Sequence, residues 1–218
     1  MTTIVSYDGT PNDDDALTLA SVLGEVGARL ILAYVRHDAD GRDLDQAHEL
    51  LARGAASLAD ACLETRVVVN GSTSEGLREL AVAVGADLIV FGSDYRTPAG
   101  RIAPQSSTQK LLQGGPAAIA MAPAGYVERP VQTIGLLAGL DDAAAIDTAH
   151  AMANHFGATV TDRSYGIDLL IVGSRPEAQE GQTLLSAHAE NAIVGTTAPV
   201  LVVGRGVAVD FRSELYIS

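Results

Sequence analysis

The sequence predicts an α/β fold: a five-stranded parallel sheet with helices on both faces, followed by a shortened second copy of the same unit. Short apolar runs alternate with amphipathic segments over residues 1–124. This alternation is typical of strand–helix–strand units in a covered parallel sheet. Part of the pattern recurs after residue 130, which indicates an internal repeat.

The composition indicates a folded protein whose partners are not polyanions. The 218 residues are 47% hydrophobic and carry a net charge of −13, so we expect a sizeable core and neither nucleic acid nor an anionic membrane surface as a partner. No apolar stretch approaches the roughly 18 residues of a membrane span. Cys62 is the only cysteine, and the N-terminus lacks a basic region followed by an apolar run. We therefore expect a cytoplasmic protein without a disulfide framework.

The first strand and the first helix meet at a polar turn. Residues 3–7 are predicted as a strand, and residues 11–26 as a helix with apolar positions at helical spacing. Thr10 suits the N-cap of this helix, and Asp13 complements its positive end. Consecutive helical residues point about 100° apart. We therefore interpret the acidic run 13–15 as a solvated helix face and not as a metal site.

The remaining elements of the first unit follow in alternating order. Ser72 with Glu75, and Ser106 with Gln109, form the capping-box pattern that opens a helix. A parallel sheet of this kind binds ligands at the carboxyl ends of its strands. The predicted elements are strands at 30–35, 66–70, 88–91 and 117–121 and helices at 43–63, 72–84 and 106–113.

The internal repeat has two offsets. Residues 133–139 match residues 3–9 at an offset of 130, whereas residues 168–174 match residues 87–93 at an offset of 81. The difference of 49 between these offsets is the number of residues that the second copy lacks. The missing piece corresponds to the second helix, third strand and third helix of the first copy.

The repeat predicts the domain organisation. A shortened sheet leaves its face bare unless it packs on the first copy, so we expect an intramolecular pseudo-dimer, with a monomer or a homodimer of such chains both open. The alternating C-terminal residues are expected to form either an edge strand or a loosely ordered tail. The predicted boundaries are 1–124 for the complete domain, 125–130 for a linker, 131–206 for the shortened domain and 207–218 for the tail.

The first unit resembles the universal stress protein family. The order and spacing of the matching residues agree over nearly all of residues 2–124, and the whole chain is similar to a tandem member with a degenerate second half. The resemblance implies the Rossmann-like, adenine-nucleotide α-hydrolase-like fold with five parallel strands, commonly dimerised through the last strand. The matching residues are Tyr7-Asp8-Gly9-Thr10, 87–93, Ser106 and 116–121.

The resemblance also locates a nucleotide motif. Nucleotide-binding members of the family carry Gly-x2-Gly-x9-Gly-Ser/Thr after the fourth strand, where glycines let backbone N–H groups approach phosphates. In this chain the motif falls on Gly92, Tyr95, Gln105 and Ser106. Two of the three glycines are therefore replaced by residues with side chains, so we expect nucleotide binding to be weak.

Four further residues complete the candidate site. The resemblance places Asp8 and Val35 in the adenine and ribose region, and Arg96 and Arg101 are candidate phosphate contacts in the loop after the fourth strand. Asp8, Ser106 and the two arginines each have an alternative role. Asp8 suits a turn, Ser106 suits a helix N-cap, and loop arginines are commonly solvated.

The second copy lacks the corresponding residues. Its motif reads Gly173, Pro176, Ser186 and Ala187, and Ala138 replaces the counterpart of Asp8. We expect no nucleotide there.

The sequence shows neither a catalytic constellation nor a metal motif. There is no Gly-x-Ser-x-Gly elbow, and Lys110 is not placed like the lysine of a phosphate-binding loop. One acidic segment holds ligand types without the spacing of a zinc or calcium site. Its residues are His37, Asp38, Asp40, Asp43, Asp45 and His48.

We therefore expect a non-enzymatic, cytoplasmic stress-response protein that requires no cofactor and binds ATP, ADP or AMP weakly in its first domain. Binding is expected to order residues 93–105 and to change what docks on that surface. The alternative is a nucleotide-free interaction scaffold for an unidentified protein partner, in which Tyr95 and Gln105 fill the pocket. Slow ATP hydrolysis is a third hypothesis.

Overall fold

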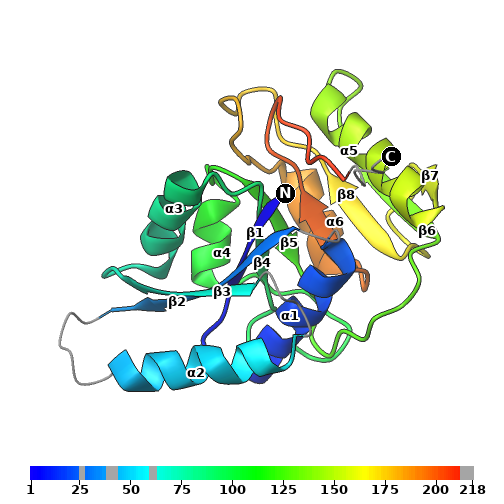
Figure 1. Cartoon of the computed structure of the whole chain (residues 1–218). Helices are drawn as coiled ribbons and strands as arrows, with labels where there is room; N and C mark the ends of the chain where they lie inside the picture. The colour runs from blue at the N-terminus through cyan, green and yellow to red at the C-terminus, as the bar shows by residue number, and fades with distance from the viewer. Residues whose placement is uncertain (25–27, 38–43, 59–62, 212–218) are drawn as a thin grey trace, which may run out of the picture.

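Nine strands form one continuous sheet in the part of the chain that the computed structural model describes, residues 1–24, 28–37, 44–58 and 63–211 (Figure 1). The strand order is β3-β2-β1-β4-β5-β9-β8-β6-β7. Neighbouring strands are parallel except β5 and β9, which are antiparallel. The predicted α/β fold is confirmed.

The first half contains five strands and four helices among the described residues. Helices α1 and α2 pack on one face of the sheet with the apolar side chains of Val5, Leu32 and Val90, and α3 and α4 pack on the opposite face. The elements are β1 (Thr2–Ser6), α1 (Pro11–Leu23), β2 (Arg29–Arg36), α2 (Leu44–Ala56), β3 (Leu63–Val69), α3 (Thr73–Val84), β4 (Leu88–Phe91), α4 (Ser106–Leu111) and β5 (Ala118–Met121).

The second half repeats this order in shortened form. Within the described residues it has no counterparts of α2, β3 and α3, which is the piece that the offsets of the repeat identify as missing. The boundaries between the two units stay a prediction. The elements are β6 (Thr133–Leu137), α5 (Ala143–Phe156), β7 (Thr159–Thr161), β8 (Leu169–Val172), α6 (Ala187–Gly195) and β9 (Val200–Val202).

The two halves join where β5 pairs with β9. Ala120 lies opposite Leu201 at the centre of this pairing, and both side chains are fully buried. The hydroxyl of Thr183 adds a second link by donating to the carbonyl oxygen of Leu111 at 2.7 Å. Apolar side chains of both halves cover both faces of the junction, so the halves share a core on each face of the sheet.

The C-terminal segment packs against α5 over residues 207–211. Val209 and Phe211 are buried in the same cluster as α5, and the backbone N–H of Val209 donates to Thr148 Oγ1 at 3.0 Å. Both expectations for the tail are therefore wrong for residues 207–211, which form neither an edge strand nor a loose end. The shortened half has no α2 counterpart, so these apolar side chains cover part of its sheet layer. Residues 212–218 lie outside the described part.

Two carboxylates of the acidic run in α1 form hydrogen bonds to neighbouring turns. Asp13 and Asp15 are buried, and only Asp14 is exposed, so the solvated-face interpretation is wrong for two of the three. Asp13 accepts from the backbone N–H of Thr10 at 3.0 Å, and Asp15 accepts from that of Gly125 at 2.8 Å. These two carboxylates satisfy backbone donors of the turns before α1 and after β5.

None of the helices in the described ranges is long and apolar enough to cross a membrane.

We predict that Phe211→Ala lowers the free energy of unfolding by about 3 kcal/mol, the usual effect of truncating a buried phenylalanine. Urea unfolding measures it. Val207→Ala, in the same segment at a half-exposed side chain, is the control and should change stability by less than about 0.5 kcal/mol. Equal effects of the two variants would show that the segment does not contribute to the core.

Candidate functional site

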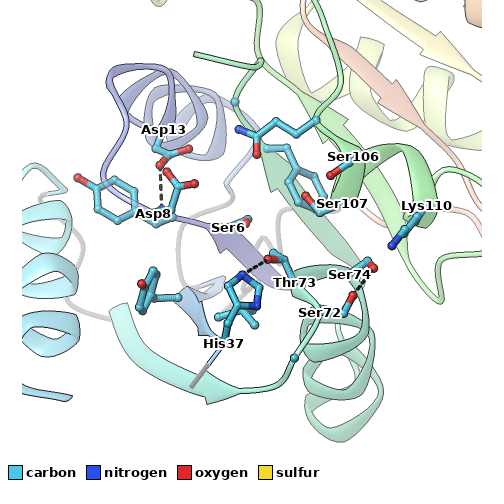
Figure 2. Close-up of a pocket in the computed structure, with 17 residues that line it drawn as sticks. Ser6, Asp8, Asp13, His37, Ser72, Thr73, Ser74, Ser106, Ser107 and Lys110 are labelled. Atoms are coloured by element: carbon cyan, nitrogen blue, oxygen red, sulfur yellow. Dashed lines mark hydrogen bonds between the residues drawn. The ribbon is translucent and has the colours of Figure 1, made fainter. Parts of the chain in front are cut away.

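The carboxyl ends of β1, β2 and β4 open into a cavity of about 520 Å³ that the starts of α3 and α4 close on the other side (Figure 2). The strand order reverses between β1 and β4, and parallel sheets commonly bind ligands at this point. The lining consists of residues 6–8, 13, 34, 35, 37, 71–74, 91, 92, 105–107 and 110.

Four residues that the resemblance assigns to a nucleotide line this single cavity. Asp8 follows β1, Val35 lies in β2, Gly92 follows β4 and Ser106 begins α4. The side chain of Val35 is buried and lies close to Gly76 of α3, where a larger residue would displace it. The fold thus brings together residues from four segments, while their roles toward a ligand stay predictions.

The two replaced glycine positions differ in where their side chains lie. Gln105 lines the cavity and is the N-cap of α4, so the expectation that Ser106 caps this helix is wrong by one residue. Tyr95 is 57% exposed and lies outside the lining. Of these two, Gln105 alone places a side chain in the cavity.

The two candidate phosphate contacts lie outside the cavity. Arg96 and Arg101 are exposed and neither belongs to the lining. Arg96 Nε donates to the hydroxyl of Tyr95 at 2.6 Å, and its guanidinium stands 4.8 Å from the centre of that ring. The Asp94 carboxylate accepts from the backbone N–H of Arg96 at 2.9 Å and holds the loop in a turn. The loop thus directs its arginines toward solvent.

The loop over residues 93–105 is ordered by contacts within the chain. The backbone N–H of Asp94 donates to Ala103 across the loop at 2.9 Å, and that of Gly100 donates to Ala124 beyond β5 at 2.7 Å. Ser93 Oγ, which is buried, donates to the carbonyl oxygen of Ala122 at 2.8 Å. These bonds argue against the expectation that a nucleotide is needed to order the loop.

Gly92 is required by close packing against α1. A Cβ at this position would collide with the backbone carbonyl of Asn12, 2.6 Å from its carbon atom. The side-chain amide of Asn12 donates to the carbonyl oxygens of Ser93 at 3.2 Å and Asp94 at 2.7 Å. The first turn of α1 and the end of β4 are therefore fastened together at the floor of the cavity.

Two carboxyl groups lie side by side at the β1 end of the cavity. Asp13 Oδ2 accepts from the backbone N–H of Asp8 at 2.8 Å, as Figure 2 shows. Burial, together with the hydrogen bond and the charge of the Asp8 carboxyl, raises the pKa of Asp13 from 3.8 to about 8, although the backbone donors of Asp8 and Thr10 act in the opposite direction. Near neutral pH this pair therefore retains a proton.

Several polar lining residues were not expected from the sequence. Thr73 Oγ1 lies 3.4 Å from His37 Nε2, and the hydroxyls of Ser72 and Ser74 lie 3.0 Å apart. Lys110 also lines the cavity, although it is not placed like the lysine of a phosphate-binding loop. The topology could have found the serines, because every loop that follows a parallel strand ends at the same sheet edge.

In the second half, side chains of Asp142 and Ala138 lie close to Gly173, the counterpart of Gly92. A Cβ at Gly173 would collide with the carboxylate of Asp142 and lie 3.0 Å from the Cβ of Ala138. Asp142 is buried, and its Oδ1 caps α5 by accepting from the backbone N–H of Ala145. The expectation that no nucleotide binds there stays a prediction.

The described residues contain no group of three or more side chains that could hold a metal ion. Three candidate ligands of the acidic segment, Asp38, Asp40 and Asp43, and the cysteine Cys62 lie outside the described ranges.

The cavity and the strand order agree with the family comparison. The model of the universal stress protein family matches residues 1–123, which is more than half of the chain. The chain belongs to the universal stress protein family. This membership rests on the first half and the strand order that it contains.

Solved structures are similar to nearly the whole chain. A universal stress protein from Archaeoglobus fulgidus DSM 4304 is 14% identical, with a TM-score of 0.61, over 94% of this chain and 98% of that one. A Pseudomonas aeruginosa UCBPP-PA14 protein assigned to the universal stress proteins is 16% identical, with a TM-score of 0.64, over 93% and 92%. At these identities the similarity shows the fold alone.

A third similar structure is a universal stress protein in complex with cAMP. It is 26% identical over 41% of this chain and 74% of that chain, with a TM-score of 0.34. The similarity is too partial to inform the site of this chain. A search of curated proteins found no match.

We predict that Gly92→Ala destabilises the protein by about 2–3 kcal/mol, because its methyl group forces β4 away from α1. Chemical denaturation measures the change. Gly195→Ala is the matched control, since a Cβ there meets open space at the end of α6 and should change stability by less than about 1 kcal/mol. An unchanged Gly92→Ala protein would contradict the packing role.

We predict that Asp13 makes the protein less stable as the pH rises. The unfolded carboxyl loses its proton near pH 4 and the folded one near pH 8, so the folded state binds more protons between these values, and stability falls through that window. The free energy of unfolding, measured by chemical denaturation at several pH values in this range, should decline more steeply with pH for the wild type than for Asp13→Asn. Asp14→Asn, at the exposed neighbour, should keep the wild-type slope. Parallel wild-type and Asp13→Asn profiles would contradict the assignment.

Proposed function

We propose that this protein is a cytoplasmic, non-enzymatic, regulatory universal stress protein that binds an adenine nucleotide in the cavity of its first half. The observation that carries the proposal is that Asp8, Val35, Gly92 and Ser106 line one cavity. Its volume of about 520 Å³ falls within the usual range for small-molecule sites.

The lining supplies the chemistry that such a ligand needs. Val35 gives an apolar surface beside β2 for the base, and the Asp8 carboxyl accepts hydrogen bonds from ribose hydroxyls. The hydroxyl of Ser106 donates to phosphate. Because Asn12 and Asp13 hold the surrounding turns through hydrogen bonds, the site is preformed and loses little conformational entropy on binding.

A binding role is proposed in preference to catalysis because the lining is poorly arranged for proton transfer. The histidine–hydroxyl pair of the cavity is Thr73 with His37, and its 3.4 Å separation is long for an activated nucleophile. Asp8 and Asp13 lie at the other side of the cavity in Figure 2 and are paired with each other. A steady-state assay of phosphate release tests this part of the proposal.

A nucleotide-free interaction scaffold is the second candidate function, and Gln105 favours it. This side chain lies in the cavity at the position of the family's third glycine, where it occupies space near a phosphate. The exposed ring of Tyr95 stands on the adjoining surface, where it is available to a protein partner.

We predict saturable one-site binding when ATP, ADP and AMP are titrated calorimetrically into the full chain, with and without magnesium. Asp8→Ala should weaken nucleotide binding about tenfold, because a hydrogen bond between the ribose and the Asp8 carboxyl is lost. Asp14→Ala removes the same charge from the exposed neighbouring helix position and should leave affinity unchanged.

The scaffold gives a different result in the same titration. It predicts no heat for the wild type at millimolar nucleotide and measurable binding by Gln105→Gly, which restores the family's glycine. That pair of results would contradict the nucleotide-binding proposal and favour the scaffold. Absence of binding by both proteins would also overturn the nucleotide-binding proposal and direct the search to protein partners.

A further inference from the structure

Lys110 is the only lysine of the chain, and it lines the cavity. Its ammonium group forms no ion pair with any residue in the part of the chain that the structure describes. The protein carries a net charge of −13, so carboxylates are abundant, yet none of the described ones pairs with this exposed side chain. An unpaired cation at a cavity is suited to an anionic ligand.

Hydroxyl groups surround this lysine on the same side of the cavity. Ser106 and Ser107 lie four and three residues before it on the same face of α4. Ser74 enters from α3 and lines the same cavity as Ser107 and Lys110. An ammonium group with several hydroxyl donors is a suitable set for one phosphate group.

Acidic and basic residues of the lining lie on opposite sides of the cavity. The carboxyls of Asp8 and Asp13 lie on one side of the cavity, and Lys110 lies on the other (Figure 2). His37 is the other basic residue of the described lining, and Arg96 and Arg101 lie outside it. A lysine compensates the charge of one phosphate group far better than that of a triphosphate.

The segment that holds the phosphates in nucleotide-binding members of the family is less suitable for phosphate in this chain. Gln105 replaces the third glycine with a side chain that lines the cavity, and Tyr95 replaces the second. The loop is also closed by the hydrogen bond from Gly100 to Ala124. The donors that remain available to a phosphate are therefore those on the Lys110 side.

Resting on the proposed nucleotide site, we propose that its ligand is a nucleoside monophosphate whose phosphate binds Lys110 together with the hydroxyls of Ser74 and Ser107. The base then lies toward Val35. The site thus discriminates by the number of phosphates, and it prefers AMP to both adenosine and ATP.

Calorimetric titration of adenosine, AMP and ATP into the full chain tests this inference. We expect AMP to bind at least about tenfold more tightly than adenosine or ATP, the usual size of a charge-assisted contact. Lys110→Met should weaken AMP about tenfold and leave adenosine unchanged, whereas Lys110→Arg should retain most of the preference. Arg101→Met removes a cation from the same region outside the cavity and should leave all three affinities unchanged.

The outcomes separate this inference from the proposed function. Equal affinity for adenosine and AMP, or an AMP affinity that Lys110→Met does not change, overturns the phosphate assignment while the nucleotide site stands. Loss of AMP binding in Arg101→Met would overturn the assignment of the phosphate to Lys110 and indicate that the loop over residues 93–105 binds it. Absence of binding by adenosine, AMP and ATP alike overturns the proposed function itself. Coincident unfolding curves of the variants and the wild type establish that each variant is folded.

Discussion

The antiparallel pairing of β5 with β9 is the interaction on which the rest of the structure depends. An unpaired edge strand exposes backbone donors and acceptors, and the strands that meet here carry fully buried apolar side chains on both faces. Each half therefore supplies what the other lacks. The shortened half gains a continuous sheet, and its remaining exposed layer is covered by Val209 and Phe211 of the C-terminal segment, so the loss of a helix and its neighbours is tolerated.

The two halves hold different polar residues at the same turn. In the second half a buried carboxylate, Asp142, stands against Gly173. In the first half the corresponding turn holds Asn12, whose amide binds the two carbonyl oxygens that follow β4. Because these polar groups fasten the walls instead of filling the space between them, a cavity stays open beside Gly92. A preformed cavity of this kind favours recognition of a small ligand over reshaping of a loop.

The polarity of the cavity follows from the topology of the sheet. The carboxyl pair is contributed by the β1–α1 turn, whereas the hydroxyls and Lys110 come from α3 and α4 on the opposite face. Strands β1 and β4 are neighbours although α1, α2 and α3 lie between them in the chain. Two groups of opposite charge therefore face each other across the point where the strand order reverses, without an ion pair between them.

Periodicity and spacing predicted the order and type of the elements, because these depend on local pattern. The resemblance to the family implied that Asp8, Val35, Gly92 and Ser106 share one site, and the rule that ligands lie at the carboxyl ends of parallel strands agrees with that location. Local pattern could not predict which way side chains outside regular elements point. Asp13 and Asp15 are buried because the turns that pack on α1 bring backbone donors to them. Arg96 points to solvent because its loop closes on itself. Lys110 reaches the cavity because α4 packs beside α3 on the opposite face from α1, a relation between distant segments that exists only in the folded chain.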